Sequence, residues 1–98
     1  MATRTYMRGG EVVTFETKVL FSTTYIDMSG LRVLTHARQG RYMQPTREAA
    51  EEALKNLLEN NTEQRLADIY GPQSIGTFRV DAFECYEHGD PIHLLEKP

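Results

Sequence analysis

The sequence of 98 residues has no tryptophan and a single cysteine, Cys85. One cysteine cannot form an intramolecular disulfide, which is typical of a reducing compartment. Runs of large apolar residues reach only about three positions, as at 19–21, whereas a transmembrane helix needs about 20. The N-terminal residues also lack the apolar centre of a secretory signal. These absences predict a cytoplasmic protein without a membrane span.

Charge is present in both signs but is divided unevenly along the chain. The 11 basic and 14 acidic residues give a net charge of −3. Seven basic and three acidic residues lie before Glu48, whereas four basic and eleven acidic residues lie from Glu48 onward. Such a division favours binding to charged partners and is compatible with self-association as a homodimer. The length and the apolar content of 40% fit a single small domain over residues 1–98.

The first half of the chain has the period of β-strands. Residues 11–26 alternate apolar and polar side chains, which predicts one long strand. A turn at 27–30 and a second alternating segment at 31–37 predict a hairpin. A further turn at 38–40 and a short third strand at 41–43 follow. Residues 1–10 and 89–98 show weaker patterns, so we expect flexible or peripheral tails there.

The second half begins with two helices. Thr46 is a suitable N-cap for a helix through Asn60, whose apolar residues recur at helical spacing. Asn61 is the expected cap of a shorter helix to about Tyr70. Residues 74–87 then read as a central or bulged strand. The sequence thus predicts an α+β fold, with an antiparallel sheet of three to four strands, two helices on one face, and the order β-β-(β)-α-α-β.

No strong catalytic or cofactor motif is present. Cys85, His88 and His93 are weak zinc candidates, because thiolate and imidazole suit zinc but structural sites normally show four clear ligands. Cys85 with a histidine also resembles a nucleophile and its base, yet nothing in the sequence orients the base. We therefore expect no metal, no cofactor and no catalysis.

Three surfaces are candidates for binding a partner. Even spacing and a following turn gather a basic cluster, the predicted helix carries an acidic face, and the C-terminal segment is apolar. The basic cluster consists of Arg32, His36, Arg38 and Arg41. The acidic face carries Glu48, Glu51 and Glu52, and the apolar segment contains Ile92, Leu94 and Leu95. The leading hypothesis is a small non-catalytic regulatory protein that binds another protein through a charged surface. By class analogy, its acidic half resembles small phage-encoded inhibitors, or accessory factors, that occupy the nucleic-acid site of a host nucleoprotein enzyme.

Two alternatives remain open. The arginine-rich hairpin, with Tyr42 nearby, could contact phosphates and stack on bases as a nucleic-acid-binding accessory protein, although the acidic net charge opposes this. A small oligomeric enzyme or ligand-binding fold would instead gather His36, Cys85 or His88 around a pocket, or an acidic run: Asp81, Glu84, Glu87 and Asp90.

Overall fold

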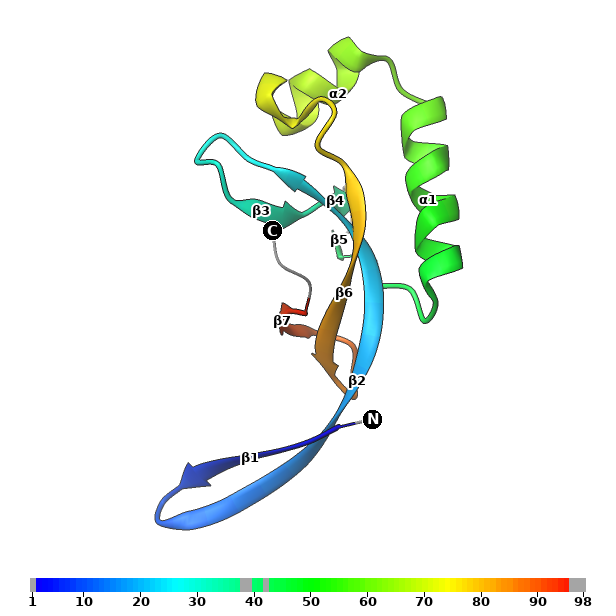
Figure 1. Ribbon diagram of the computed structural model, residues 1–98. Helices are drawn as coiled ribbons and strands as arrows, with labels where there is room; N and C mark the ends of the chain where they lie inside the picture. The colour runs from blue at the N-terminus through cyan, green and yellow to red at the C-terminus, as the bar shows by residue number, and fades with distance from the viewer. Residues whose placement is uncertain (1, 38–39, 42, 96–98) are drawn as a thin grey trace.

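A computed structural model describes residues 2–37, 40–41 and 43–95 and shows an antiparallel sheet with two helices (Figure 1). The predicted α+β fold is confirmed. In chain order the elements are β1 (Ala2–Arg8), β2 (Glu11–Ile26), β3 (Arg32–Leu34), β4 (His36–Ala37), β5 (Gly40–Arg41), α1 (Arg47–Glu59), α2 (Glu63–Tyr70), a 3-10 helix (Pro72–Ser74), β6 (Arg79–Tyr86) and β7 (Pro91–Leu94).

The long strand β2 organises the sheet, in the order β1-β2-β6-β7, with β3 pairing the far end of β2. Strand β1 pairs with β2 from Glu11 to Thr17, and β6 pairs with it from Thr17 to Thr24. The pairing partner therefore changes sides at Thr17. Residues 2–16, which we call the arm, form a two-stranded ribbon that projects from the rest of the protein and gives it extents of 52 × 28 × 25 Å.

The main apolar core lies between α1 and the sheet. Ala50 and Leu54 of α1 are buried against Val80 of β6, and half-buried apolar residues surround them: Phe21, Leu57 and Phe78. The predicted cap of α1 is confirmed, because Thr46 Oγ1 accepts a hydrogen bond from the Ala49 amide at 3.1 Å. This core anchors the half of β2 that lies beyond the arm.

The cap of α2 is Thr62, not Asn61 as predicted. Thr62 Oγ1 accepts from the Arg65 amide at 3.1 Å, while the Asn61 side chain donates to the Leu57 carbonyl at 2.8 Å. Asn61 thus closes the end of α1 and leaves the capping of α2 to its neighbour. Near its end, α2 places Tyr70 against the rings of Tyr25 and Phe78.

Much of the two terminal segments that were expected to be flexible or peripheral tails is β-strand. Strand β1 occupies most of residues 1–10, and β7 occupies residues 91–94. The polar threonines and arginines of β1 weaken its alternation, because this strand has little core to face. Both strands are nevertheless at the edges of the sheet.

Two strand boundaries also differ from the prediction. Residues 74–78 form the end of the 3-10 helix and a turn, in which Ser74 Oγ donates to the Gly71 carbonyl at 2.6 Å and Gly76 has a φ of +79°. The predicted strand at 31–37 is interrupted at Thr35, whose amide and hydroxyl both donate to the Thr23 carbonyl. Of the third strand predicted at 41–43, only Arg41 is in a strand, as the end of β5, which pairs with β4, and Met43 is outside it. Residues 38–39 of the predicted turn, and Tyr42, lie outside the described residues. Strand β6, which was expected to be central or bulged, lies between β2 and β7 and has a bulge between Glu84 and Cys85.

Candidate binding surface

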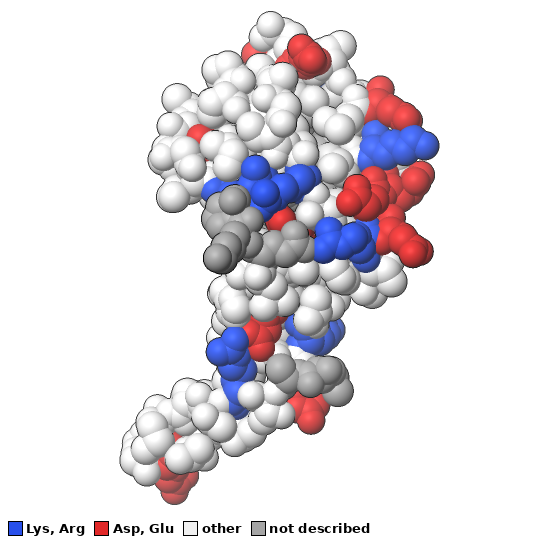
Figure 2. All heavy atoms as spheres, viewed as in Figure 1, with Lys and Arg blue, Asp and Glu red and all other residues white. Residues whose placement is uncertain are grey.

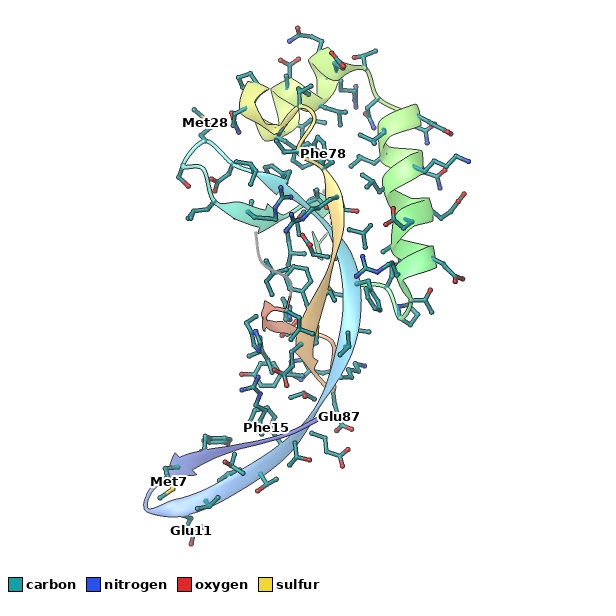
Figure 3. All side chains as sticks on the ribbon, viewed as in Figure 1. Met7, Glu11, Phe15, Met28, Phe78 and Glu87 are labelled. Atoms are coloured by element: carbon teal, nitrogen blue, oxygen red, sulfur yellow. The ribbon has the colours of Figure 1, made fainter. Side chains whose placement is uncertain are left out.

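The arm lies outside the main core and exposes apolar side chains on both faces. Gly9 and Gly10 join its strands with φ angles of +57° and +84°, as a two-residue type I′ turn requires. Tyr6 is 45% exposed on one face, and Met7 and Val12, each 65% exposed, lie on the other. Figure 3 shows side chains on both faces of this ribbon. An isolated two-stranded hairpin is at best marginally stable in water, so the arm is suited to contact with another molecule.

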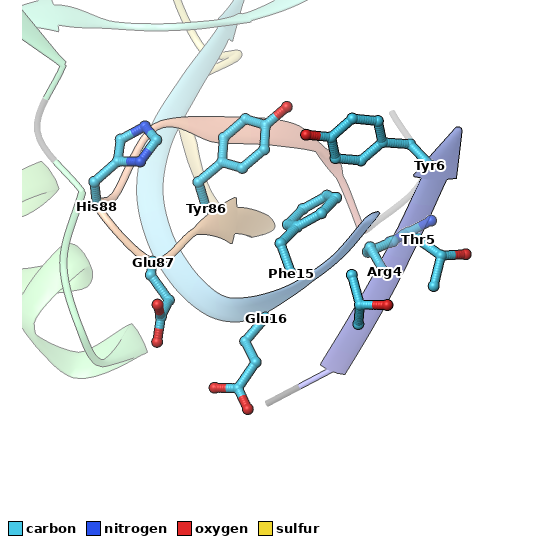
Figure 4. Close-up of a pocket in the computed structure, with 9 residues that line it drawn as sticks. Arg4, Thr5, Tyr6, Phe15, Glu16, Tyr86, Glu87 and His88 are labelled. Atoms are coloured by element: carbon cyan, nitrogen blue, oxygen red, sulfur yellow. The ribbon is translucent and has the colours of Figure 1, made fainter. Parts of the chain in front are cut away.

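Four ring side chains form a row from the arm to the body, which we call the aromatic row. The ring centroids of Tyr6 and Phe15 are 5.8 Å apart, and those of Phe15 and Tyr86 are 5.5 Å apart. His88 stacks on Tyr86 at 5.3 Å and an interplanar angle of 7°. In Figure 4 these rings lie on one side of the strands, whereas Glu16 and Glu87 point to the other side.

An open groove runs where the arm leaves the body, beside the aromatic row. Besides the four rings, it is lined by polar and charged residues: Arg4, Thr5, Thr14, Glu16 and Glu87. Tyr86 is 39% exposed, so its ring is accessible to a partner. Large accessible aromatic side chains are typical of protein interfaces.

A buried carboxylate fastens the arm to the body. Glu84 of β6 is an acceptor for Arg4 of the arm, with Arg4 Nε 3.0 Å from Oε2, and for Thr17 Oγ1 at 2.7 Å. His93 Nε2 of β7 lies 2.6 Å from the same carboxylate. The Arg4 hydrogen bond, followed by that of Thr17, lowers the pKa of Glu84 to about 2. Since the Glu84 side chain is only 7% exposed, this Glu84 cluster is the ionic joint of the arm.

A second ionic cluster lies on the opposite face of the sheet. Asp81 is fully buried and accepts hydrogen bonds from Thr24 Oγ1 at 2.5 Å and from Arg79 Nε at 2.9 Å. Arg32 donates to Thr24 Oγ1 and to the Thr77 carbonyl, both at 2.9 Å. Burial, followed by the positive charge of Arg79, lowers the pKa of Arg32. The carboxylate of Asp81 therefore binds Arg79 directly and is linked to Arg32 through the Thr24 hydroxyl.

Of the predicted basic cluster, the structure describes the side chain of Arg32 and the strand positions of His36 and Arg41. Arg32 is tied into the Asp81 cluster, and Figure 2 shows a patch of basic side chains on this face of the molecule. His36 and Arg41 lie opposite each other in the β4–β5 pair. Arg38 lies outside the described residues. Arg32 thus has an internal bonding role that sequence spacing did not reveal.

The other predicted surfaces lie on different sides of the sheet. Glu48, Glu51 and Glu52 are exposed on α1, which covers one side (Figure 1). Ile92 and Leu94 are half-buried on the other side, in a shallow groove shared with Arg32 and Phe83, while Leu95 is 46% exposed. The acidic and apolar candidates therefore do not form one continuous surface.

The weak metal candidates are held by different partners. Cys85 is fully buried, its thiol donates to the Phe83 carbonyl at 3.7 Å, and burial raises its pKa. His88 bonds to Asp90 at 3.1 Å, while His93 belongs to the Glu84 cluster. Among residues 2–37, 40–41 and 43–95, no three His, Cys, Asp or Glu side chains gather as metal ligands would. Within the same ranges, no helix has the length and apolarity needed to span a membrane.

Sequence reasoning did not find the arm or the aromatic row. One signal was available, because Gly9-Gly10 next to an alternating segment is a hairpin pattern. The approach of Tyr86 to Phe15 depends on the β2–β6 register and had no local signal. Comparisons of the chain with protein-family models, with curated proteins and with solved structures gave no match.

Proposed function

We propose that this protein is a small non-catalytic module that binds another protein, and that the aromatic row on the arm makes the central contact. The observation that carries the proposal is the row itself. Tyr6, Phe15 and Tyr86 form a continuous set of rings that runs from the arm, a ribbon with little core of its own, to the body. Binding energy at protein interfaces concentrates on such aromatic anchors.

The charges near the row support a protein partner over a nucleic acid. Arg4, the arginine that lines the groove, is already paired with Glu84, while Glu16 and Glu87 point away from the rings. Platforms for single-stranded nucleic acids combine stacking rings with a positively charged groove. The net charge of −3 also opposes binding to a polyanion. A groove whose one lining arginine is already paired suits a polypeptide.

The proposal is tested by capture of partners from the native cell or its host with a tagged chain, followed by measurement of the dissociation constant. We expect one protein at stoichiometric amount. Tyr86→Ala and Tyr6→Ala should each weaken its binding about 30-fold, the effect of losing a contact worth about 2 kcal/mol.

Met28→Ala is the matched control, because Met28 is 84% exposed but lies in the turn after β2, outside the arm. It should leave the dissociation constant unchanged. Recovery of nucleic acid alone, or equal effects of the Met28 and Tyr86 substitutions, would contradict the proposal. The identity of the captured protein would decide whether the module inhibits or assists a nucleoprotein enzyme.

A further inference from the structure

The two ends of the sheet differ in how their edges are protected. Strand β7 has four residues, begins at Pro91 and pairs with β6 across a bulge, all features that discourage pairing with another strand. Strand β1 has seven residues in regular register with β2 and contains neither proline nor bulge. Among the described strands, none pairs with its outer edge. It is therefore an open edge, available to a further strand.

The turn determines which groups of β1 point outward. Arg8 and Glu11 flank the two-residue turn and form a hydrogen-bonded pair. Because bonded pairs alternate along antiparallel strands, Thr3, Thr5 and Met7 direct their N–H and C=O groups away from β2. Further along the same edge of β2, Phe21 exchanges both backbone bonds with Gln44, at 2.8 and 2.7 Å, which agrees with this alternation.

A second copy of β1 fits this edge when the two strands run antiparallel about Thr5. Thr5 then pairs with Thr5, and Thr3 with Met7, so all the outward groups of these residues are bonded. On the aromatic face, Arg4 comes opposite Tyr6 of the second copy. A two-fold axis through Arg4 or through Tyr6, in place of Thr5, would put arginines of the two copies directly opposite each other. Like charges in that position destabilise the pairing.

The charge and exposure of these side chains support the same register. The salt bridge to Glu84 neutralises Arg4, whose side chain is still 47% exposed and can pack on a tyrosine ring. The two copies of Arg8 lie at opposite ends of the paired strands. Met7, at 65% exposure, is covered by Thr3 of the second copy. Each arm becomes part of a ribbon of four strands, above the number that is marginal in isolation.

We infer that the protein forms a two-fold dimer in which the β1 strands of two copies pair antiparallel about Thr5. The interface is isologous, because the same edge contributes from both copies. Its backbone hydrogen bonds come from the edge of the arm, and of the aromatic row it uses only Tyr6, beside Arg4 of the second copy. The inference therefore goes beyond the proposed function and does not depend on it.

The first experiment measures mass by light scattering after size exclusion, from micromolar to millimolar concentration. We expect wild type to approach about 22 kDa, twice the 11.2 kDa of one chain. Thr5→Pro should remain at the mass of one chain, because it removes an outward N–H while leaving the bonds to β2 intact. Thr5→Ala keeps that N–H and should remain dimeric.

The second experiment tests the register by oxidative crosslinking. Paired residues across the axis have Cα atoms about 5.5 Å apart, within reach of a disulfide. Thr5→Cys should therefore give a covalent dimer. Thr14→Cys is the matched control, since Thr14 lies opposite Thr5 on the same face but three strand spacings, about 14 Å, from its copy. Native Cys85 is fully buried.

A single-chain mass for wild type over the whole range would overturn the inference. A dimer that survives Thr5→Pro would overturn it as well, as would crosslinking of Thr14→Cys equal to that of Thr5→Cys. Tyr86→Ala should leave the dimer mass unchanged, because β2 separates Tyr86 from β1. Failure of partner binding and failure of dimerisation are thus observed separately.

Discussion

Glu84 shows how one side chain holds two parts of this protein together. Its carboxylate receives Arg4 from the arm, Thr17 from the middle of β2 and His93 from β7. Removing one partner from such a buried ionic group costs more than the pair itself contributes, since the remaining charge stays desolvated. The Asp81 cluster uses the same chemistry on the other face of the sheet.

Acid should release the Glu84 joint. The folded-state pKa of about 2 lies below the ordinary value of 4.5, so the stabilisation is complete above about pH 5 and is lost as pH falls towards 2. Over this range, Glu84 in the unfolded chain takes up about one proton more than in the folded chain. Urea unfolding of wild type and Glu84→Gln at several pH values should show that the free energy of unfolding of the variant falls less steeply as the pH is lowered from about 5 towards 2.

The control for this measurement is Glu51→Gln, on the exposed face of α1. Its free energy of unfolding should fall with decreasing pH as steeply as that of wild type. Equal pH slopes for wild type and Glu84→Gln would show that the Glu84 cluster does not contribute to folding.

Among the elements, α1 carries most of the main core, and its start is fixed by one hydroxyl. Thr46 satisfies the Ala49 amide, and Ala50 follows one residue later with 1% exposure. The cap therefore determines where the helix begins and which residues face Val80. The same arrangement recurs at Thr62 in α2.

Thr46→Ala should lower the free energy of unfolding by about 1 kcal/mol, because an amide in the first turn loses its acceptor. Thr46→Ser keeps a hydroxyl and should stay close to wild type. Chemical denaturation of the three proteins checks this. If Thr46→Ala and Thr46→Ser lowered the free energy of unfolding equally, the methyl group of Thr46, and not its hydroxyl, would stabilise the helix.

At the scale of the whole molecule, stability is expected to change along β2. Beyond Thr17 this strand has β6 beside it and α1 over part of one face, whereas before Thr17 it has β1 alone. Segments with little buried apolar surface open at lower free-energy cost than core strands. The arm should therefore open without unfolding of the body.

Hydrogen exchange followed by mass spectrometry should show this division. In monomeric Thr5→Pro, amides of residues 3–15 should exchange about tenfold faster, or more, than those of residues 79–85. In wild type, protection of β1 should rise with protein concentration if its edge is paired. Uniform exchange along β2 in the monomeric variant would show that the arm and the body unfold as one unit.

The sequence by itself determined what depends on neighbouring residues. The period of residues 11–26, the cap at Thr46 and the end of the second helix at about Tyr70 follow from backbone geometry and hydrogen bonds over a few positions. These features were sufficient for the α+β class and for the boundaries of the long strand and of the two helices. They failed at Ser74 and Thr35, where side-chain hydrogen bonds end or delay a strand.

Only the tertiary structure decided the candidate binding surface. Arg4 and Glu84 are 80 positions apart, and Tyr86 reaches Phe15 through the register of β2 with β6. Such contacts depend on which strands are neighbours and on where the pairing changes sides, at Thr17. A local pattern shows that a strand alternates, but pairing over long sequence separation determines which face is covered and which edge stays open.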